Sequence, residues 1–438
     1  MPENLDLLLH ARWVLPIDEK ESVLEHHAVA IHGGRIVAVL PQDQARHRYH
    51  PARVVELPDH VLMPGLINTH AHAAMTLLKG IGDDLPLMRW LEEAIWPVEQ
   101  RHVSESFVRD GTLLAAAEML RGGITTCNDM YFFPGAAAEA FDRCGMRAVI
   151  GIVVVEAPTP WATDADEYFR KGLAERAQWR HAPLLGFSIA PHAPYSVSNA
   201  SLERATSLAA ELDCSLHVHI HETKHEIEQS LKQYGLRPLE RFARLGLLGP
   251  NFLGVHCVHL EPHEIELLAR HNCSVAHCPT SNMKLASGIA PVRAMQAAGV
   301  RVSLGTDGSA SNNRLDLFGE MRQAALLAKV STGDATVLPA YSVLRMATQE
   351  AADSIGLGNE VGSIEPGKAA DLCAVDLSTL DMQPCYDPVS HLVYVADRQQ
   401  VSHVWVGGES RLERGVLKLQ IDNTELLAAN RVWQTRIQ

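Results

Sequence analysis

The stretch "VLMPGLINTHAH", residues 61–72, decides the fold: it is an apolar run that ends in two histidines one residue apart. Because side chains alternate along a strand, His70 and His72 would share one face while Ala71 points to the other. The chain has 23 histidines in 438 residues. Chance alone gives about one His-x-His among them, so the pair by itself is weak evidence for a metal site. Its meaning depends on which other segments show the same pattern.

Seven further apolar runs occur along the chain, and longer amphipathic stretches such as "SLERATSLAAELD" (201–213) separate them. Short strands that alternate with helices indicate parallel βα units. Eight such units over about 300 residues predict a (β/α)₈ TIM-like barrel rather than an open sheet. The eight predicted strands span residues 61–72, 123–130, 147–155, 184–194, 215–222, 252–259, 273–282 and 300–308.

The two ends of the chain differ from its middle. Near the N-terminus, "HHAVAIHGGRIVAVL" (26–40) contains a Gly-Gly turn between two β-rich runs, which is typical of a hairpin. Strands return at "VSHVWVGGESRLERGVL" (401–417), before a predicted C-terminal helix. The sequence therefore predicts a small β-sandwich domain built from residues 1–60 and 363–438, which flanks a barrel domain of residues 61–362.

Composition excludes several classes of function. The formal net charge is −14, so nucleic-acid binding is not expected. The longest apolar run, around "AVIGIVVV" (148–155), is too short to span a bilayer, and the first residues lack the pattern of a secretory signal. Eight cysteines without a CxxC pair predict reduced thiols and a cytoplasmic protein.

The predicted strand ends are rich in metal-capable groups, and in a barrel these ends form the active-site face. Each such residue alone also has an ordinary explanation, as a hydrogen-bonded surface histidine or an Asp-Gly turn. Together, three imidazoles and one carboxylate, with room for a water, are typical of a hydrolytic site for a borderline metal ion. The residues concerned are His70, His72, His192, His256, His259, His277 and Asp307, together with His217, His219, His221 and Glu222 of "HVHIHE" (217–222), whose three histidines we expect on one face.

These motifs resemble those of the amidohydrolase superfamily. The match includes "PGLINTHAH" (64–72), "HVHIHE" and "LGTDG" (304–308), and, in the flanking β-domain, "VAIHGGRIVAV" (29–39) and "GSIEPGKAADL" (362–372). More narrowly, the chain resembles the methylthioadenosine/S-adenosylhomocysteine deaminases. The shared stretches are "HAAMTLLKGIGDDLPLMRWLEEAIWPVE" (72–99), "APHAPYSVS" (190–198), "HCVHL" (256–260), "PTSNMKLASGIAPV" (279–292) and "GTDGSASNN" (305–313).

The resemblance implies one zinc ion per chain, held by His70, His72, His219 and Asp307. Residues 184–194 contain no lysine that could become a carboxylated metal bridge, which favours a mononuclear site. The resemblance also implies that Asp307 transfers the proton of the attacking water and that Glu222 protonates the purine ring. His256 would orient the water or stabilise the tetrahedral intermediate. Glu222 could instead be a helix-start carboxylate, and His256 a core histidine.

The same resemblance assigns the substrate contacts. Trp90 would pack against the base or the ribose, although a tryptophan in such a segment is usually a core residue. Glu99 would accept hydrogen bonds from the ribose hydroxyls, although it could be an ordinary helix acid. The complete set of expected substrate-binding residues is Trp90, Glu99, His192, Glu222 and Asp307.

The expected activity is the hydrolytic deamination of 5′-modified adenosines, chiefly 5′-methylthioadenosine. In the family, arginines bind the homocysteine carboxylate of the alternative substrate, S-adenosylhomocysteine. Here Arg147 lies nearby in sequence, but "GIVVVEAPTPWATD" (151–164) offers no second arginine. This difference favours the uncharged methylthio group over homocysteine, and adenosine is a further candidate.

Two other functions stay open. One is amino- or chlorohydrolysis of another heterocycle, such as a guanine, a pterin or a triazine. The other is a non-catalytic barrel scaffold, for which we would expect lost ligands, whereas all four are present here. As partners we expect a small nucleoside but no nucleic acid or membrane. The resemblance to the family also implies a homodimer.

Overall fold

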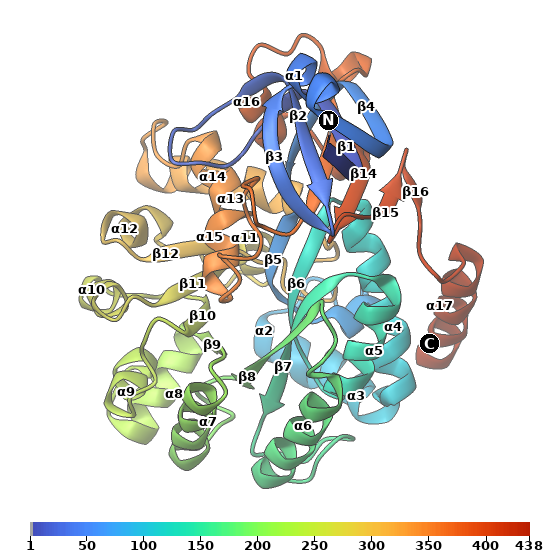
Figure 1. Cartoon of the computed structure of the whole chain (residues 1–438). Coiled ribbons are helices and arrows are strands. Elements are labelled where there is room, and N and C mark those ends of the chain that lie inside the picture. The colour runs from blue at the N-terminus through green and yellow to red at the C-terminus, as the bar shows by residue number, and fades with distance from the viewer. Residues whose placement is uncertain (1–2) are drawn as a thin grey trace.

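A computed structural model describes residues 3–438, which form a barrel of eight parallel strands beside a second, mixed sheet (Figure 1). Seven of the barrel strands lie within their predicted segments and β6 extends one residue beyond its segment, to Tyr131, so the predicted barrel is confirmed. Its strands are β5 (Leu66–Ala71), β6 (Ile124–Tyr131), β7 (Arg147–Val154), β8 (Leu185–Pro191), β9 (Leu216–Ile220), β10 (Phe252–His256), β11 (Ser274–His277) and β12 (Arg301–Leu304).

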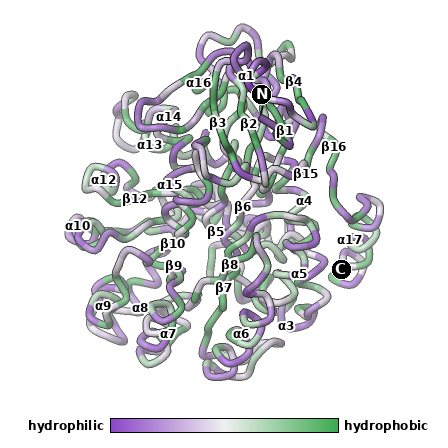
Figure 2. The backbone as a smooth tube through the Cα atoms, viewed as in Figure 1, coloured by the Kyte–Doolittle hydropathy of each residue, from purple (hydrophilic) through white to green (hydrophobic). Residues whose placement is uncertain are grey.

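Helices surround the barrel, and in Figure 2 hydrophilic and hydrophobic colours alternate along most of them, as expected when one helix face packs inward. Strand β7 is buried throughout, which explains its nearly continuous apolar sequence. The barrel helices are α4 (Glu105–Arg121), α5 (Pro134–Cys144), α6 (Ala165–Trp179), α7 (Asn199–Glu211), α8 (Lys224–Tyr234), α9 (Pro238–Arg244), α10 (Pro262–Arg270), α11 (Pro279–Lys284), α12 (Val292–Ala297), α13 (Leu317–Thr332), α14 (Ala340–Met346) and α15 (Gln349–Ser354).

Buried polar side chains join the last barrel strand to the first. The Thr69 hydroxyl donates to the Leu304 carbonyl oxygen at 2.8 Å. Asn68 exchanges two hydrogen bonds with Thr306, one from its amide to the Thr306 hydroxyl at 2.8 Å and one from the Thr306 backbone N–H at 3.0 Å. The Asp307 N–H then donates to the His70 carbonyl oxygen at 3.0 Å. These bonds place the residues after β12 beside the histidines of β5.

Between β5 and α4 the chain forms a long connection that covers the carboxyl end of the barrel. It contains a 3₁₀ helix and, more unusually, one turn of π-helix, a conformation that is frequent at functional sites. Its elements are η1 (Ala73–Leu78), α2 (Leu87–Arg89), the π-helix η2 (Trp90–Ile95) and α3 (Trp96–His102).

Both ends of the chain contribute to the second sheet, as expected. Strand β4 (Tyr49–Pro64) pairs in parallel with β1 (Glu3–Val14), and its last residues pair antiparallel with β13 (Leu372–Asp376). The proposed domain limits, 1–60 with 363–438 and 61–362, stay a prediction. The remaining elements at the two ends are β2 (Leu24–His32), β3 (Arg35–Pro41), α1 (Gln42–Arg48), η3 (Leu380–Met382), α16 (Pro388–Tyr394), η4 (Arg398–Gln400), β14 (Val401–Val406), β15 (Glu409–Glu413), β16 (Val416–Leu417) and α17 (Asn423–Ile437).

A buried ion pair connects the barrel to this second sheet. The Arg147 guanidinium, at the start of β7, donates to both carboxylate oxygens of Asp371 at 2.8 and 3.1 Å. The two side chains are 7% and 1% exposed. The Gly407 N–H also donates to Asp371, at 2.7 Å. Across residues 3–438, no helix has both the length and the apolar character to cross a membrane.

We expect Arg147→Met to lower the free energy of unfolding by about 3–5 kcal/mol, because it leaves the Asp371 charge buried without its partner. The double change Arg147→Met with Asp371→Leu should recover much of this loss, since neither charge is then buried. The measurement is urea unfolding followed by circular dichroism.

The exposed pair of Arg46 and Glu56, whose side chains are 55% and 54% exposed, provides the control. We expect Arg46→Met to change the unfolding free energy by less than about 1 kcal/mol. Equal losses in the two arginine variants would contradict a stabilising role for the buried pair.

Candidate metal-dependent active site

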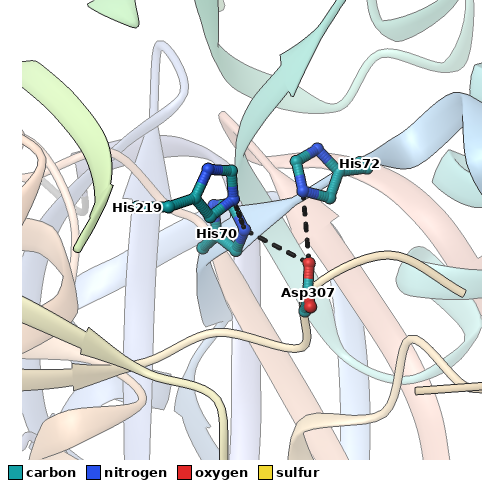
Figure 3. A group of neighbouring side chains, drawn as sticks. All are labelled: His70, His72, His219 and Asp307. Atoms are coloured by element: carbon teal, nitrogen blue, oxygen red, sulfur yellow. Dashed lines mark hydrogen bonds and ion pairs between the residues drawn. The ribbon is translucent and has the colours of Figure 1, made fainter. Parts of the chain in front are cut away.

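Four metal-capable side chains meet at the carboxyl end of the barrel (Figure 3). His70 lies in β5 and His72 directly after it, His219 lies in β9, and Asp307 follows β12. One nitrogen or oxygen atom of each lies within 4.8 Å of the corresponding atom of the other three. The structure therefore brings together the four candidate ligands that the family resemblance implies.

The geometry leaves one ligand atom of each residue directed at a common point. The Nε2 atoms of His70 and His72 lie 3.3 and 3.2 Å from Oδ1 of Asp307. Nδ1 of His72 bonds the Met130 carbonyl oxygen at 2.5 Å, and Nδ1 of His219 bonds the His192 carbonyl oxygen at 2.7 Å. Because a carbonyl can only accept, both Nδ1 atoms carry the proton and both Nε2 atoms are free to bind a metal.

Protonation also suits a cation. Burial lowers the pKa of His70 to about 3 and that of His219 well below its ordinary value. Burial alone would raise the pKa of Asp307, but hydrogen bonds from His70 and His72 hold it well below its usual range. Against the effect of burial, Asp307 raises the pKa of His72 to about 9. An incoming divalent ion would therefore displace a proton from His72.

The backbone is strained where these side chains emerge. Asp307 has a φ of 62° and His256 a φ of 73°, in the left-handed region that favours glycine. Such conformations cluster at functional sites, where the surrounding structure maintains them. Gly305 is required next to Asp307, because a Cβ atom there would lie 2.9 Å from the His70 Cβ.

The second oxygen of Asp307 is held by two hydroxyl groups. Ser281, in the short helix α11 that follows β11, donates to Oδ2 at 2.6 Å, and Ser311 donates to it at 2.7 Å. The Gly308 N–H donates to Oδ1 at 2.8 Å. These three donors fix the carboxylate plane so that Oδ1 faces the histidines.

Glu222 lies just beyond β9 and is only 7% exposed. Burial raises its pKa to about 7, so the carboxyl group is protonated in a large fraction of the molecules near neutral pH. The N-terminus of α8 does not use this side chain, since Thr223 accepts the capping bond from the Glu226 N–H at 3.3 Å. This arrangement argues against the helix-start explanation of Glu222.

His256, at the end of β10, lies beside Glu222. Its Nε2 is 3.9 Å from Oε2 of Glu222, and its ring stacks on that of His219 with an interplanar angle of 18°. Nδ1 of His256 lies 2.9 Å from Oδ1 of Asn282. The histidine is thus buried within the cluster and not in the apolar core.

A cavity of about 690 Å³ opens from these groups, a volume in the range of small-molecule sites. Trp90 of η2 and Glu99 of α3 line it, so the covering connection contributes two predicted residues. Burial raises the pKa of Glu99, which accepts a 2.6 Å hydrogen bond from the Tyr131 hydroxyl. His192 also lines the cavity, and burial lowers its pKa to about 4.

The lining of the cavity is mostly apolar. Among the described residues no lysine or arginine lines it, whereas Glu156 does. Hydrogen bonds from Ser198 overcome the effect of partial burial and lower the pKa of Glu156, so this carboxylate stays charged. Arg147 lies in the ion pair with Asp371 and does not line the cavity. The apolar lining includes Leu91, Ile95, Trp96, Phe132, Val155, Pro158 and Pro160.

Four other histidines from the predicted strand ends have different contacts. His217 supports a ligand, because its Nε2 lies 2.9 Å from Nδ1 of His70. The expectation that His221 shares its face is wrong: β9 ends at Ile220, and His221, with a φ of 56°, lies 3.2 Å from Glu264 instead. His259 contacts the Ser287 carbonyl oxygen at 2.8 Å, and His277 is buried away from the cavity lining.

Sequence reasoning did not identify several residues that support the site. Ser281 and Asn282 belong to "PTSN" (279–282), the carboxyl end of the predicted segment 273–282, and this position was the available signal. Ser311 and Tyr131 are common residue types, and nothing in the local sequence marks them as contacts of the site. Only the three-dimensional arrangement reveals their contacts with Asp307 and Glu99.

Comparison with known proteins agrees with this geometry. The family model described as the amidohydrolase family matches residues 61–411. A protein of Teredinibacter turnerae named 5-methylthioadenosine/S-adenosylhomocysteine deaminase is 46% identical over 437 residues, which cover 99% of this chain and 98% of the relative. A protein of the same name from Syntrophobacter fumaroxidans is 44% identical, with 95% of each chain covered.

Solved structures give the same result. An adenosine deaminase from Xanthomonas campestris with bound zinc has a TM-score of 0.98 at 50% identity, with 100% of this chain and 99% of the other covered. An atrazine chlorohydrolase from Arthrobacter aurescens, complexed with zinc, has a TM-score of 0.90 at 25% identity and 98% and 99% coverage. From the matched family model, the near full-length relatives and the shared fold, we conclude that this chain belongs to the amidohydrolase family.

Proposed function

We propose that this protein is a zinc-dependent deaminase that hydrolyses the 6-amino group of 5′-modified adenosines, chiefly converting 5′-methylthioadenosine to 5′-methylthioinosine. One observation carries the proposal: three imidazoles and a carboxylate converge beside a buried, protonatable glutamate in a nucleoside-sized cavity. The names of the near full-length relatives support the substrate class. The experiment that tests it is ammonia release from 5′-methylthioadenosine by the purified protein.

The metal fits the residues present, since His70, His72, His219 and Asp307 supply the nitrogen and oxygen ligands that zinc prefers. Bound zinc would supply Lewis acidity that makes a water molecule nucleophilic near neutral pH. Asp307, which lines the cavity, takes a proton from the attacking water at its carboxylate and passes it to the departing amine. The hydrogen bonds from Ser281 and Ser311 keep this carboxylate in place during both transfers.

Glu222 acts on the purine ring. The amino group leaves only when the ring accepts electron density, so a proton must reach N1. The Glu222 carboxyl group, with its pKa raised to about 7, holds that proton at the working pH. His256, with Nε2 3.9 Å from the same carboxyl group, orients the attacking water or stabilises the tetrahedral centre.

The rest of the cavity binds the nucleoside. We assign Trp90 to packing against the base or ribose and Glu99 to the ribose hydroxyls, because both line the cavity and Tyr131 holds Glu99 in place. His192 contacts the base, alongside Glu222 and Asp307. The cavity lining has no lysine or arginine among the described residues, which suits a methylthio group. The carboxylate of S-adenosylhomocysteine would instead share the cavity with Glu156 without a compensating positive charge.

A second candidate is hydrolysis of another heterocycle, because an atrazine chlorohydrolase shares the fold at a TM-score of 0.90. A chlorotriazine has no ribose to engage the carboxylate of Glu99, so the nucleoside remains the better match. The complete set of four ligands argues against a non-catalytic scaffold.

We also propose a homodimer located in the cytoplasm, without nucleic-acid or membrane partners. All eight cysteines lie in the described part of the chain and none forms a disulfide there, which suits a reducing compartment. The negative net charge opposes phosphate binding.

The first prediction concerns the metal. The purified protein should contain about one zinc per chain, because one set of four ligands is present. His70→Ala, His72→Ala and His219→Ala should each lose both zinc and deaminase activity, whereas His32→Ala, on an exposed part of β2, should lose neither. Zinc is measured by mass spectrometry, and full turnover by verified metal-free protein would contradict the proposal.

The second prediction separates metal binding from ring protonation. Glu222→Gln should keep zinc and a KM close to normal, because the amide preserves volume and hydrogen bonding. Its kcat should fall about 10²–10⁴-fold, since the amide cannot deliver a proton. Asp307→Asn should be more damaging, since it weakens both the metal site and the proton transfer.

The matched control is Glu228→Gln, an exposed change on α8, the helix that follows Glu222. It should leave zinc, kcat and KM unchanged. A Glu222→Gln variant with near-normal kcat would place the proton donor elsewhere, and one without zinc would make Glu222 part of the coordination sphere.

The third prediction concerns substrate preference. The wild type should have a higher kcat/KM for 5′-methylthioadenosine than for S-adenosylhomocysteine. Glu156→Gln should raise the S-adenosylhomocysteine-to-methylthioadenosine ratio roughly two- to fivefold, as expected from one partly screened charge. Glu203→Gln, an exposed change on α7, should leave the ratio unchanged. An equal kcat/KM of the wild type for both substrates would refute the proposed preference for the uncharged methylthio group.

A further inference from the structure

The stretch "HCPTSN" (277–282) runs from the last residue of β11 into the short helix α11, and its last residue contacts the proposed active site. Asn282 is 1% exposed. Its Oδ1 lies 2.9 Å from Nδ1 of His256. Its Nδ2 is buried and has no hydrogen-bond partner among residues 3–438. Within the described residues the Asn282 side-chain amide therefore makes one hydrogen bond, and its partner is His256.

The chemistry of this contact fixes the proton on His256. An amide oxygen can only accept a hydrogen bond, so Nδ1 of His256 must carry hydrogen. A neutral imidazole has one N–H, which leaves the lone pair on Nε2. That atom lies on the side of Glu222, 3.9 Å from its Oε2, and His256 lines the cavity.

The surroundings keep the side chains of His256 and Asn282 in this orientation. The His256 ring stacks on His219 at a centroid distance of 5.5 Å. The Asn282 backbone is held on both sides, because its N–H donates to the Cys278 carbonyl oxygen at 3.0 Å and its carbonyl accepts from the Ser287 N–H at 2.8 Å. Rotation of either side chain would break a buried hydrogen bond without offering a replacement.

We propose that Asn282 is a positioning residue for the reaction: it holds His256 as the Nδ1–H tautomer with Nε2 directed at Glu222 and the reacting centre. Oδ1 accepts the same hydrogen bond whether or not Nε2 holds a proton. His256 can therefore exchange a proton at Nε2 without moving its ring. This role rests on the proposed deaminase function.

Two variants of similar size separate the hydrogen bond from packing. Asn282→Leu removes the acceptor, so kcat for 5′-methylthioadenosine should fall roughly 10- to 100-fold, as for other groups that orient active-site histidines. KM and zinc content should stay close to wild type, because Asn282 does not line the cavity and its side-chain hydrogen bond is to His256. Asn282→Asp keeps an acceptor at the same place and should recover most of the lost kcat.

The control is Asn251→Leu, an exposed asparagine that bonds the Cys214 carbonyl oxygen far from the cavity lining. It should leave kcat unchanged. If Asn282→Leu does not fold or loses zinc, Asn282→Ala takes its place in every comparison, because it removes the same acceptor without adding bulk.

A double-mutant cycle with His256→Gln provides the decisive measurement. If Asn282 acts through His256, Asn282→Leu should reduce kcat in the wild type but not in the His256→Gln background. Equal reductions in both backgrounds, a near-normal kcat in Asn282→Leu, or an Asn282→Asp variant as slow as Asn282→Leu would each overturn the proposal. A wild type that releases no ammonia from 5′-methylthioadenosine would instead refute the proposed function, so the two failures are distinguishable.

Discussion

The closure of the barrel between its last and first strands is the constraint on which the site depends. At this junction Asn68, Thr69 and Thr306 make buried side-chain hydrogen bonds between the β5 segment and the β12 segment. The Asp307 N–H donates to the His70 carbonyl oxygen, which determines where both side chains start. Residues more than two hundred positions apart in sequence thereby become neighbours. A closed barrel is thus a precondition for the metal ligands to meet.

Hydrogen bonds to the second nitrogen of each imidazole complete this arrangement. Backbone carbonyls of Met130 and His192 orient His72 and His219, while His217 supports His70. A backbone carbonyl cannot be lost by substitution, so two of the three histidines depend on strand position more than on neighbouring side chains. His256 differs, since its partner is the side chain of Asn282. A single substitution, at Asn282, can therefore remove the hydrogen bond that orients His256, whereas no substitution removes the backbone carbonyls that orient the candidate ligands His72 and His219.

Features that depend on local pattern are predictable from the sequence. Alternation along "INTHAH" (67–72) places His70 and His72 correctly, and strand spacing predicts the eight-stranded barrel. The same rule fails at His221, because alternation holds only while the chain stays extended and β9 ends at Ile220. Trp90 and Glu99 come from family resemblance alone, since the π-helical connection that carries them has no clear periodicity. The hydroxyls that hold Asp307 depend on how two loops meet, which no local pattern encodes.

The pairing of β4 with β13 has a consequence for protein synthesis. The two strands lie on opposite sides of the barrel sequence, so β4 leaves the ribosome long before its antiparallel partner exists. Until then residues 60–64 of β4 lack this partner, and their unpaired backbone N–H and C=O groups are a template for association with other chains. Non-local pairing of this kind is also slow to form. The nascent chain therefore carries an unpaired strand edge during most of its elongation, and chaperone binding near residues 60–64 would protect it at this stage.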